Sequence, residues 1–111
     1  MRKYLIASIL VLMVLLCCSK TEATNWETDF EKASSAAKAS GKYMLLDFSG
    51  SDWCGWCIKL EREVFSQDAF KDFAEENLVC VLVDFPRAKE QTEELKQQNL
   101  DLARKYEIKG Y

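Results

Sequence analysis

Two short runs of nearly continuous apolar residues stand out in the hydrophobic pattern of the chain. The first runs from Tyr43 to Phe48, and the second runs from Leu78 to Phe85 and stops at Pro86. Runs of this length, the second rich in valine, are typical of strands buried on both faces of a parallel sheet. Helical patterns separate and flank the two runs, so the sequence predicts an α/β fold with a strand–helices–strand crossover.

Apolar or small residues recur at helical spacing over residues 30–40, which predicts a first helix. Thr28 or Asp29 is placed to cap its start, and Gly41 is placed to end it. The next helix should begin near Cys54. Its expected core face contains Cys57, Leu60 and Val64, and its charged residues, which we expect to face solvent, are Lys59, Glu61, Arg62 and Glu63.

Two more helices are expected in the second half of the chain. Ser66 is placed to cap a helix that contains Phe70, Phe73 and Ala74. A last helical region extends from Leu95 to Tyr106 and stops before Gly110.

Composition and charge limit the class of protein. The 111 residues are 49% apolar and 30% charged, which is the composition of one ordinary globular domain. The net charge is −3, and the basic residues are not clustered into one face. Both features argue against nucleic acid as a partner.

The first 23 residues have the plan of a secretory signal. Met1-Arg2-Lys3 is basic, the thirteen residues from Tyr4 to Leu16 carry no charge, and the small residue Ala23 follows a polar stretch. A helix of thirteen residues spans only about 20 Å, less than the roughly 30 Å hydrocarbon layer of a bilayer. We therefore predict a signal peptide over 1–23, a domain over 24–111, and export to the periplasm or the medium.

Cys17 and Cys18 at the end of this segment leave a second interpretation open. One of them would be the lipidated cysteine of a bacterial lipoprotein, which would attach the protein to a membrane, although Leu16 and Cys17 are unusual residues before such a cysteine. The alternative is that both thiols are small apolar residues in a segment that is removed.

The segment Trp53-Cys54-Gly55-Trp56-Cys57 carries the candidate chemistry. Two cysteines three residues apart on the first turn of a helix have Cβ atoms about 5 to 6 Å apart, which allows a disulfide to open and close. The start of a helix favours a thiolate, so Cys54 is the predicted nucleophile. Cys57, one turn deeper and expected to be shielded, is the predicted resolving cysteine.

Three further groups of residues are assigned to or near this site. Asp47 lies within the first apolar run, and we interpret it as a proton acceptor for Cys57; a strand-end aspartate that turns outward is the alternative. Trp53, Gly55 and Trp56 form the expected substrate-binding surface, although tryptophan at a helix start is also common packing material. Cys80, among apolar neighbours, is expected to be a buried inert thiol.

Metal and haem sites are disfavoured by the ligands available. A structural zinc site needs four cysteine or histidine ligands, whereas the chain has no histidine and a single Cys-x-x-Cys pair. Attachment of c-type haem needs histidine after the second cysteine, where this chain has Ile58. We expect no metal and no cofactor.

These segments resemble the thioredoxin superfamily, most closely its exported bacterial members. The resemblance is carried by Leu45-Leu46-Asp47-Phe48, Trp53-Cys54-Gly55-Trp56-Cys57, Val83-Asp84 and the stretch from Ala103 to Gly110. It implies a three-layer αβα sandwich and thiol–disulfide exchange with protein thiols and a further redox partner. It also implies that Cys54 is the nucleophile, Cys57 the resolver and Asp47 the buried carboxylate, with one extra residue in the intervening loop.

The sequence departs from the family at its carboxyl end. The family continues with a cis-proline, a β-hairpin and a closing helix, none of which follows Tyr111 here. We expect an incomplete domain that is weakly stable and weakly active by itself. Two functions therefore stay open: an exported thiol–disulfide oxidoreductase, or a non-catalytic thioredoxin-like interaction module in which Cys54 and Cys57 form a structural disulfide.

Overall fold

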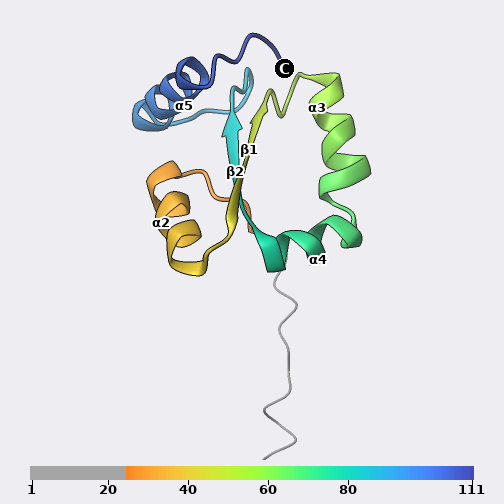
Figure 1. Cartoon of the computed structure of the whole chain (residues 1–111). Coiled ribbons are helices and arrows are strands. Elements are labelled where there is room, and N and C mark those ends of the chain that lie inside the picture. The colour runs from red at the N-terminus through yellow and green to blue at the C-terminus, as the bar shows by residue number, and fades with distance from the viewer. Residues whose placement is uncertain (1–24) are drawn as a thin grey trace, which may run out of the picture.

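The computed structural model describes residues 25–111 (Figure 1). The signal segment predicted for residues 1–23, including Cys17 and Cys18, lies outside the described residues.

Two parallel strands form the centre of the fold. Strand β1 (Tyr43–Ser49) pairs with strand β2 (Leu78–Asp84), with Tyr43 opposite Leu78 and Ser49 opposite Asp84. Each strand begins where the hydrophobic pattern predicts it and ends within one residue of the prediction. Glu27 pairs with the outer edge of β2, since its N–H donates to the carbonyl of Cys80 at 2.9 Å and its carbonyl accepts from the N–H of Leu82 at 2.8 Å.

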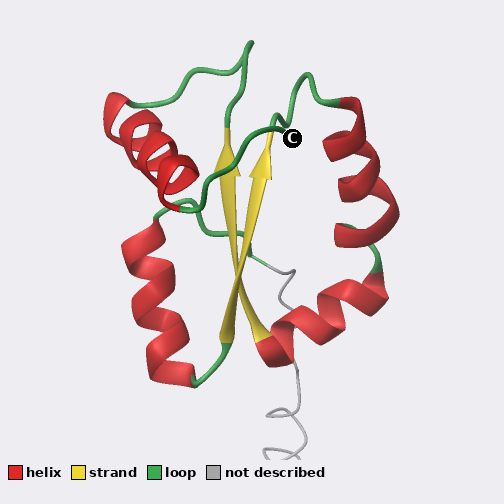
Figure 2. Cartoon of the chain, turned by 45° about the horizontal axis from the view of Figure 1, so that its top comes forward, coloured by secondary structure: helices red, strands yellow, loops and turns green. Residues whose placement is uncertain are grey.

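The helices cover both faces of this sheet. They are α2 (Phe30–Ser40), α3 (Gly55–Leu60) with its continuation η1 (Glu61–Phe65), α4 (Asp68–Asn77) and α5 (Glu93–Lys105). Figures 1 and 2 show α2 and α5 on one side of the strands and α3 and α4 on the other. The predicted three-layer αβα arrangement is confirmed.

The first helix is bounded by the residues that the sequence offers for this purpose. The Asp29 carboxylate accepts a hydrogen bond from the N–H of Lys32 at 3.0 Å, so Asp29 rather than Thr28 is the cap. Gly41 follows the helix with φ of 69°, a left-handed conformation that glycine adopts without a steric cost.

The hydrophobic core lies between the sheet and the layer of α2 and α5. Its buried residues are Ala33, Val81, Val83 and Leu102, and Met44, Leu46, Phe48 and Val79 are among those packed against them. Since successive side chains on a strand point to opposite faces, the residues between these, including Asp47 and Leu82, turn toward α3 and α4.

The predicted inner face of the helix after Cys54 is wrong. Leu60 and Val64 are 41% and 40% exposed. Apolar residues occur on more than one face of this helix, so helical spacing alone does not identify the buried one. In addition, η1 contains an i→i+5 hydrogen bond from the N–H of Ser66 to the carbonyl of Glu61, and its last residue, Phe65, is half-buried against Trp26 and Phe70.

The predicted start of the following helix is also corrected. Ser66 does not cap α4; its hydroxyl donates to the carbonyl of Glu61 and closes η1. Helix α4 begins at Asp68 and buries Ala74, as expected, but leaves Phe73 57% exposed.

Candidate redox site

Cys54 and Cys57 form a disulfide at the amino end of α3. Their Cα atoms are 5.2 Å apart. Cys54 has an extended backbone and caps the helix, and its Sγ accepts a hydrogen bond from the N–H of Cys57 at 3.2 Å. The sulfur of Cys54 therefore lies at the positive end of the helix dipole, where unpaired N–H groups stabilise negative charge.

A tight turn that starts at Gly50 positions Cys54 at the start of α3. The Gly50 carbonyl accepts hydrogen bonds from the N–H of Trp53 at 3.1 Å and the N–H of Cys54 at 2.8 Å. A Cβ atom at position 50 would lie only 2.3 Å from the Trp53 ring, so any larger residue here would require the ring to move. The turn and the tryptophan are thus packed as one unit directly before Cys54.

The burial of the two cysteines is the reverse of what the sequence suggests. Cys54 is 6% exposed, whereas Cys57 is only half-buried. Cys54 is enclosed by the turn at Gly50, with which its backbone is hydrogen-bonded, whereas Cys57 borders a cavity. In the disulfide form, the shielded cysteine is therefore Cys54, and not Cys57 as the sequence had suggested.

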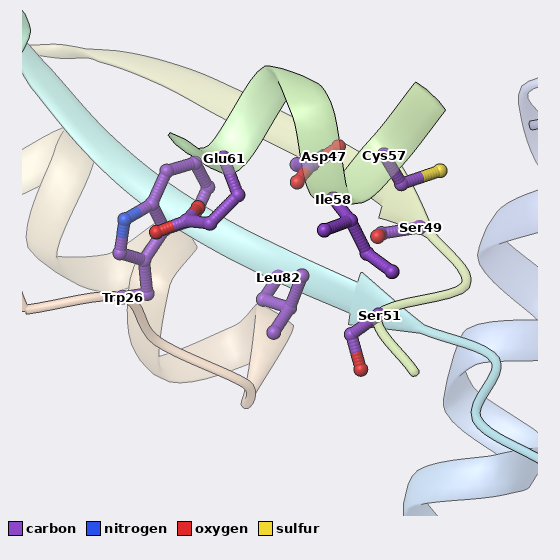
Figure 3. A pocket seen from close by; sticks show the side chains of 8 residues that line it. All are labelled: Trp26, Asp47, Ser49, Ser51, Cys57, Ile58, Glu61 and Leu82. Carbon is purple, nitrogen blue, oxygen red and sulfur yellow. The ribbon is translucent and has the colours of Figure 1, made fainter. Parts of the chain in front are cut away.

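The cavity beside Cys57 has a volume of about 270 Å³ and contains the predicted carboxylate. Its lining residues are Trp26, Asp47, Ser49, Ser51, Cys57, Ile58, Glu61 and Leu82. Figure 3 shows Trp26 and Glu61 toward one end, Cys57 and Ser49 toward the other, and Asp47 between them. The sheet register places Asp47 opposite Leu82, which brings both side chains to this cavity.

Asp47 lies in an environment that disfavours its charge. Burial raises the pKa of its carboxyl above the usual range, and the negative charges of Glu61 and then of Asp84 raise this pKa further. A carboxylate with a raised pKa is a stronger base than an ordinary aspartate. Asp47 thus combines a raised pKa with a place in the same cavity as Cys57, and its side chain does not turn outward from the strand.

Two residues of this cavity were not predicted from the sequence. Glu61 is exposed, as expected for the solvated face of its helix, but it also lines the cavity one helical turn after Cys57. The i, i+4 spacing from Cys57 was the available signal. Trp26 forms another part of the wall, and its ring lies 5.0 Å from that of Phe65, a contact between distant segments that no local pattern indicates.

The two tryptophans of the loop have different surroundings. The Trp53 indole donates from Nε1 to the carbonyl of Phe85 at 2.7 Å, and the Arg87 guanidinium lies 3.8 Å from the centre of its ring. Trp56 is 75% exposed, with the Lys59 ammonium 5.3 Å from its ring centre. Gly55 is also exposed. Trp56 and Gly55 present accessible surface beside the disulfide, whereas Trp53 is held by the protein itself.

Cys80 is a free thiol that is 2% exposed on strand β2. Burial raises the pKa of this thiol, which lowers its thiolate fraction at neutral pH. The environment is that of the inert buried cysteine expected from the sequence.

The described part of the chain lacks two other kinds of feature. Residues 25–111 contain no cluster of three or more histidine, cysteine, aspartate or glutamate residues arranged to hold a metal ion. Within the same residues, no helix has both the length and the apolar character needed to cross a membrane.

Comparison with known proteins assigns the fold to a family. A family model described as thioredoxin-like matches residues 25–107. The chain belongs to the thioredoxin-like family. The match includes the redox loop and the two strands that hold it, so the redox pair and its cavity lie within the matched region.

Two curated relatives come from Chlamydia pneumoniae. The chain is 40% identical over 86 residues to the disulfide bond reductase DsbH, covering 78% of this chain and 51% of DsbH. It is 36% identical over 83 residues to the thioredoxin-related protein DsbJ, covering 75% of this chain and 24% of DsbJ. The chain thus spans about half the length of DsbH and a quarter of DsbJ.

A solved structure agrees with these relatives. The structure of a DsbH oxidoreductase superimposes with a TM-score of 0.76 at 38% sequence identity. The superposition covers 81% of this chain and 62% of that protein.

Proposed function

We propose that this protein is an exported thiol–disulfide oxidoreductase that acts on the thiols and disulfides of other proteins. The observation that carries the proposal is the Cys54–Cys57 disulfide at the amino end of α3 in a thioredoxin-like chain. The names of DsbH and DsbJ, which denote a disulfide bond reductase and a thioredoxin-related protein, support the same chemistry.

The proposed reaction starts from the reduced pair. The Cys54 thiolate attacks one sulfur of a substrate disulfide, forms a mixed disulfide and releases the other substrate sulfur as a thiolate. The Cys57 thiolate then attacks the Sγ of Cys54 and releases the second substrate sulfur. The substrate disulfide gains two electrons, and the Cys54–Cys57 pair loses them and returns to its disulfide.

Asp47 has a defined task in the second half of this reaction. Cys57 must lose its proton before it attacks, and the Asp47 carboxylate lines the same cavity with a raised pKa. We assign it the role of proton acceptor for Cys57, which fits general base catalysis by a carboxylate whose basicity is increased by burial. In the oxidising direction the same group returns the proton.

A trapping experiment tests the assignment of the two cysteines. In Cys57→Ser the mixed disulfide of Cys54 has no resolving thiol, so covalent complexes with partner proteins should accumulate and should disappear on reduction. Cys54→Ser is the matched control and should trap markedly less. Because Cys54 is the more buried sulfur in the disulfide form, a stronger trap in Cys54→Ser would reverse the assigned roles.

The same burial favours a second function, the non-catalytic interaction module with a structural disulfide. An enclosed disulfide resists exchange because an attacking thiolate cannot reach it. The reduction potential distinguishes the two functions. A working pair should equilibrate with glutathione at a potential of roughly −120 to −270 mV, whereas a structural disulfide should lie below about −300 mV.

The direction of exchange and the cellular location belong to the same proposal. We propose that the pair acts as a reductant, by analogy with the name of DsbH. A potential toward the negative end of the working range, with reduction of insulin disulfides by the reduced protein, is the expected result. We also propose export through the segment over residues 1–23, which amino-terminal sequencing of the mature protein tests by locating the cleavage site.

A further inference from the structure

The carboxylate of Asp52, two residues before Cys54, binds three consecutive backbone N–H groups of a distant loop. Its Oδ1 accepts from the N–H of Arg87 at 2.9 Å, and its Oδ2 accepts from those of Ala88 and Lys89 at 2.8 and 3.1 Å. These hydrogen bonds, led by that from Arg87, lower the pKa of Asp52, so the carboxylate stays ionised near neutral pH. Residues 85–89 follow strand β2 and lead toward α5.

The neighbours of Asp52 make parallel connections. On one side, Ser51 donates to the Asp84 carboxylate from its N–H at 2.9 Å and from its hydroxyl. On the other side, Trp53 donates to the carbonyl of Phe85, and the Arg87 guanidinium covers its ring. Every residue from 51 to 53 is therefore bonded to the segment from 84 to 89.

We propose that Asp52 is a positioning residue for Cys54, which fastens the redox loop to residues 87–89 and so fixes the Cys54 sulfur against the start of α3. The inference deepens the proposed function and rests on it. The sulfur benefits from the helix start only while it stays within reach of the N–H of Cys57, and this requires a fixed backbone on its amino-terminal side.

Asp52 can affect the Cys54 thiol through its charge and through the position that it gives the loop. By charge alone, a carboxylate two residues from Cys54 opposes a thiolate, so its removal should lower the pKa of Cys54. By position, removal should loosen the loop and raise the pKa of Cys54 toward that of a free thiol. The two effects have opposite signs, which makes the outcome decisive.

The other ionisable groups near this loop keep their identity in both variants, although Arg87 and Lys89 are expected to move with the loosened loop. They are Asp47 on β1, Asp84 on β2, Cys57 on α3, Glu61 on η1, and Arg87 and Lys89 on the loop. A difference between the variant and the parent protein therefore reports on Asp52.

The experiment uses Asp52→Ala and Asp52→Asn in the full chain. In the reduced protein, iodoacetamide labelling of Cys54 is followed against pH by mass spectrometry of the peptide, which gives the pKa of this thiol. We expect this pKa to rise by about half a unit or more in both variants. In the disulfide form, hydrogen exchange at the amides of Ala88 and Lys89 should become about tenfold faster, since charge-assisted hydrogen bonds are lost.

Two matched variants complete the design. Asp101→Ala removes a helix-surface carboxylate that pairs with Arg104, and it should change neither readout. Arg87→Ala removes the guanidinium over Trp53 but keeps its N–H bond to Asp52, so the amides of Ala88 and Lys89 should stay protected.

The outcomes distinguish this inference from the proposed function. A lowered pKa of Cys54 in both Asp52 variants, or unchanged amide protection at residues 88 and 89, overturns the positioning role while the enzyme proposal stands. A parent protein whose Cys54 reacts no faster than a free peptide thiol at neutral pH overturns the proposed function itself.

Discussion

The Asp47 carboxyl on β1 and the Glu61 carboxyl on η1 line the same cavity behind the redox disulfide. The charge of Glu61 is one of the causes that raise the pKa of Asp47, second to burial. An acidic residue at position 61 therefore makes the proposed proton acceptor more basic. Figure 3 shows both side chains with Cys57 in one view.

Replacing Glu61 with Gln should lower the pKa of Asp47. The neutral amide removes a repulsion that disfavours the charged form, while burial and the charge of Asp84 continue to raise this pKa. The carboxyl carbon resonance of Asp47, followed by NMR against pH in the disulfide form, measures the change. Glu63→Gln is the control, because Glu63 pairs with Arg62 outside the cavity, and it should leave the titration unchanged.

Replacing Asp47 with Asn should slow exchange and stabilise the fold at neutral pH. Loss of the proposed general base should reduce the rate of disulfide reduction roughly tenfold to hundredfold. The folded protein has a raised Asp47 pKa, so it loses stability as the pH rises from the ordinary aspartate pKa of 3.8 to that raised value, because the unfolded chain ionises first. Below the ordinary aspartate pKa of 3.8 the carboxyl is protonated in both the folded and the unfolded state, and this difference vanishes.

Urea unfolding of Asp47→Asn and the parent protein across this pH range checks the sign. The advantage of the asparagine variant should grow as the pH rises from 3.8 to the folded-state pKa and should level off above it. An advantage that is largest at low pH would contradict the assignment of a raised pKa.

Replacing Gly50 with Ala should displace Trp53. The added methyl would lie 2.3 Å from its ring, so the indole must move and give up its hydrogen bond to the Phe85 carbonyl. We expect a loss of about 1–3 kcal/mol in the free energy of unfolding and a change in tryptophan fluorescence. Gly55→Ala is the control, because a Cβ at position 55 meets no atom within 4 Å, and it should not destabilise the fold.

Replacing Leu102 with Ala should open a cavity in the core between the sheet and α5. Leu102 is 6% exposed and belongs to the core cluster, so the expected loss is about 2–4 kcal/mol in the free energy of unfolding. Leu100 lies on the same helix but is 44% exposed. Leu100→Ala should cost less than about 1 kcal/mol, and equal losses in chemical denaturation would contradict the described packing.

Local patterns in the sequence were sufficient to predict the two strands, α2 and the cysteine pair. Two continuous apolar runs predict β1 and β2 because strands in a parallel sheet are covered on both sides. Asp29 and Gly41 bound α2 because capping depends on a few adjacent residues. Cys54 and Cys57 form a disulfide because a spacing of three residues at the start of a helix fixes the distance between their Cα atoms.

Tertiary structure decided which side chains surround the sulfur atoms. Burial of Cys54 and exposure of Leu60 depend on how the helix after the redox loop rotates against the sheet, and apolar residues on several of its faces leave that rotation undetermined in sequence. Glu61 enters the cavity for the same reason.

The sequence by itself therefore determined the order of the elements, the ends of α2 to within a residue and the spacing of the cysteine pair, all of which depend on residues close together in the chain. Only the fold brought Asp52 to the N–H groups of residues 87–89 and Trp26 to the cavity beside Cys57. The physical reason is that these contacts join segments about 30 or more residues apart, and their partners are set by packing and strand register rather than by local spacing.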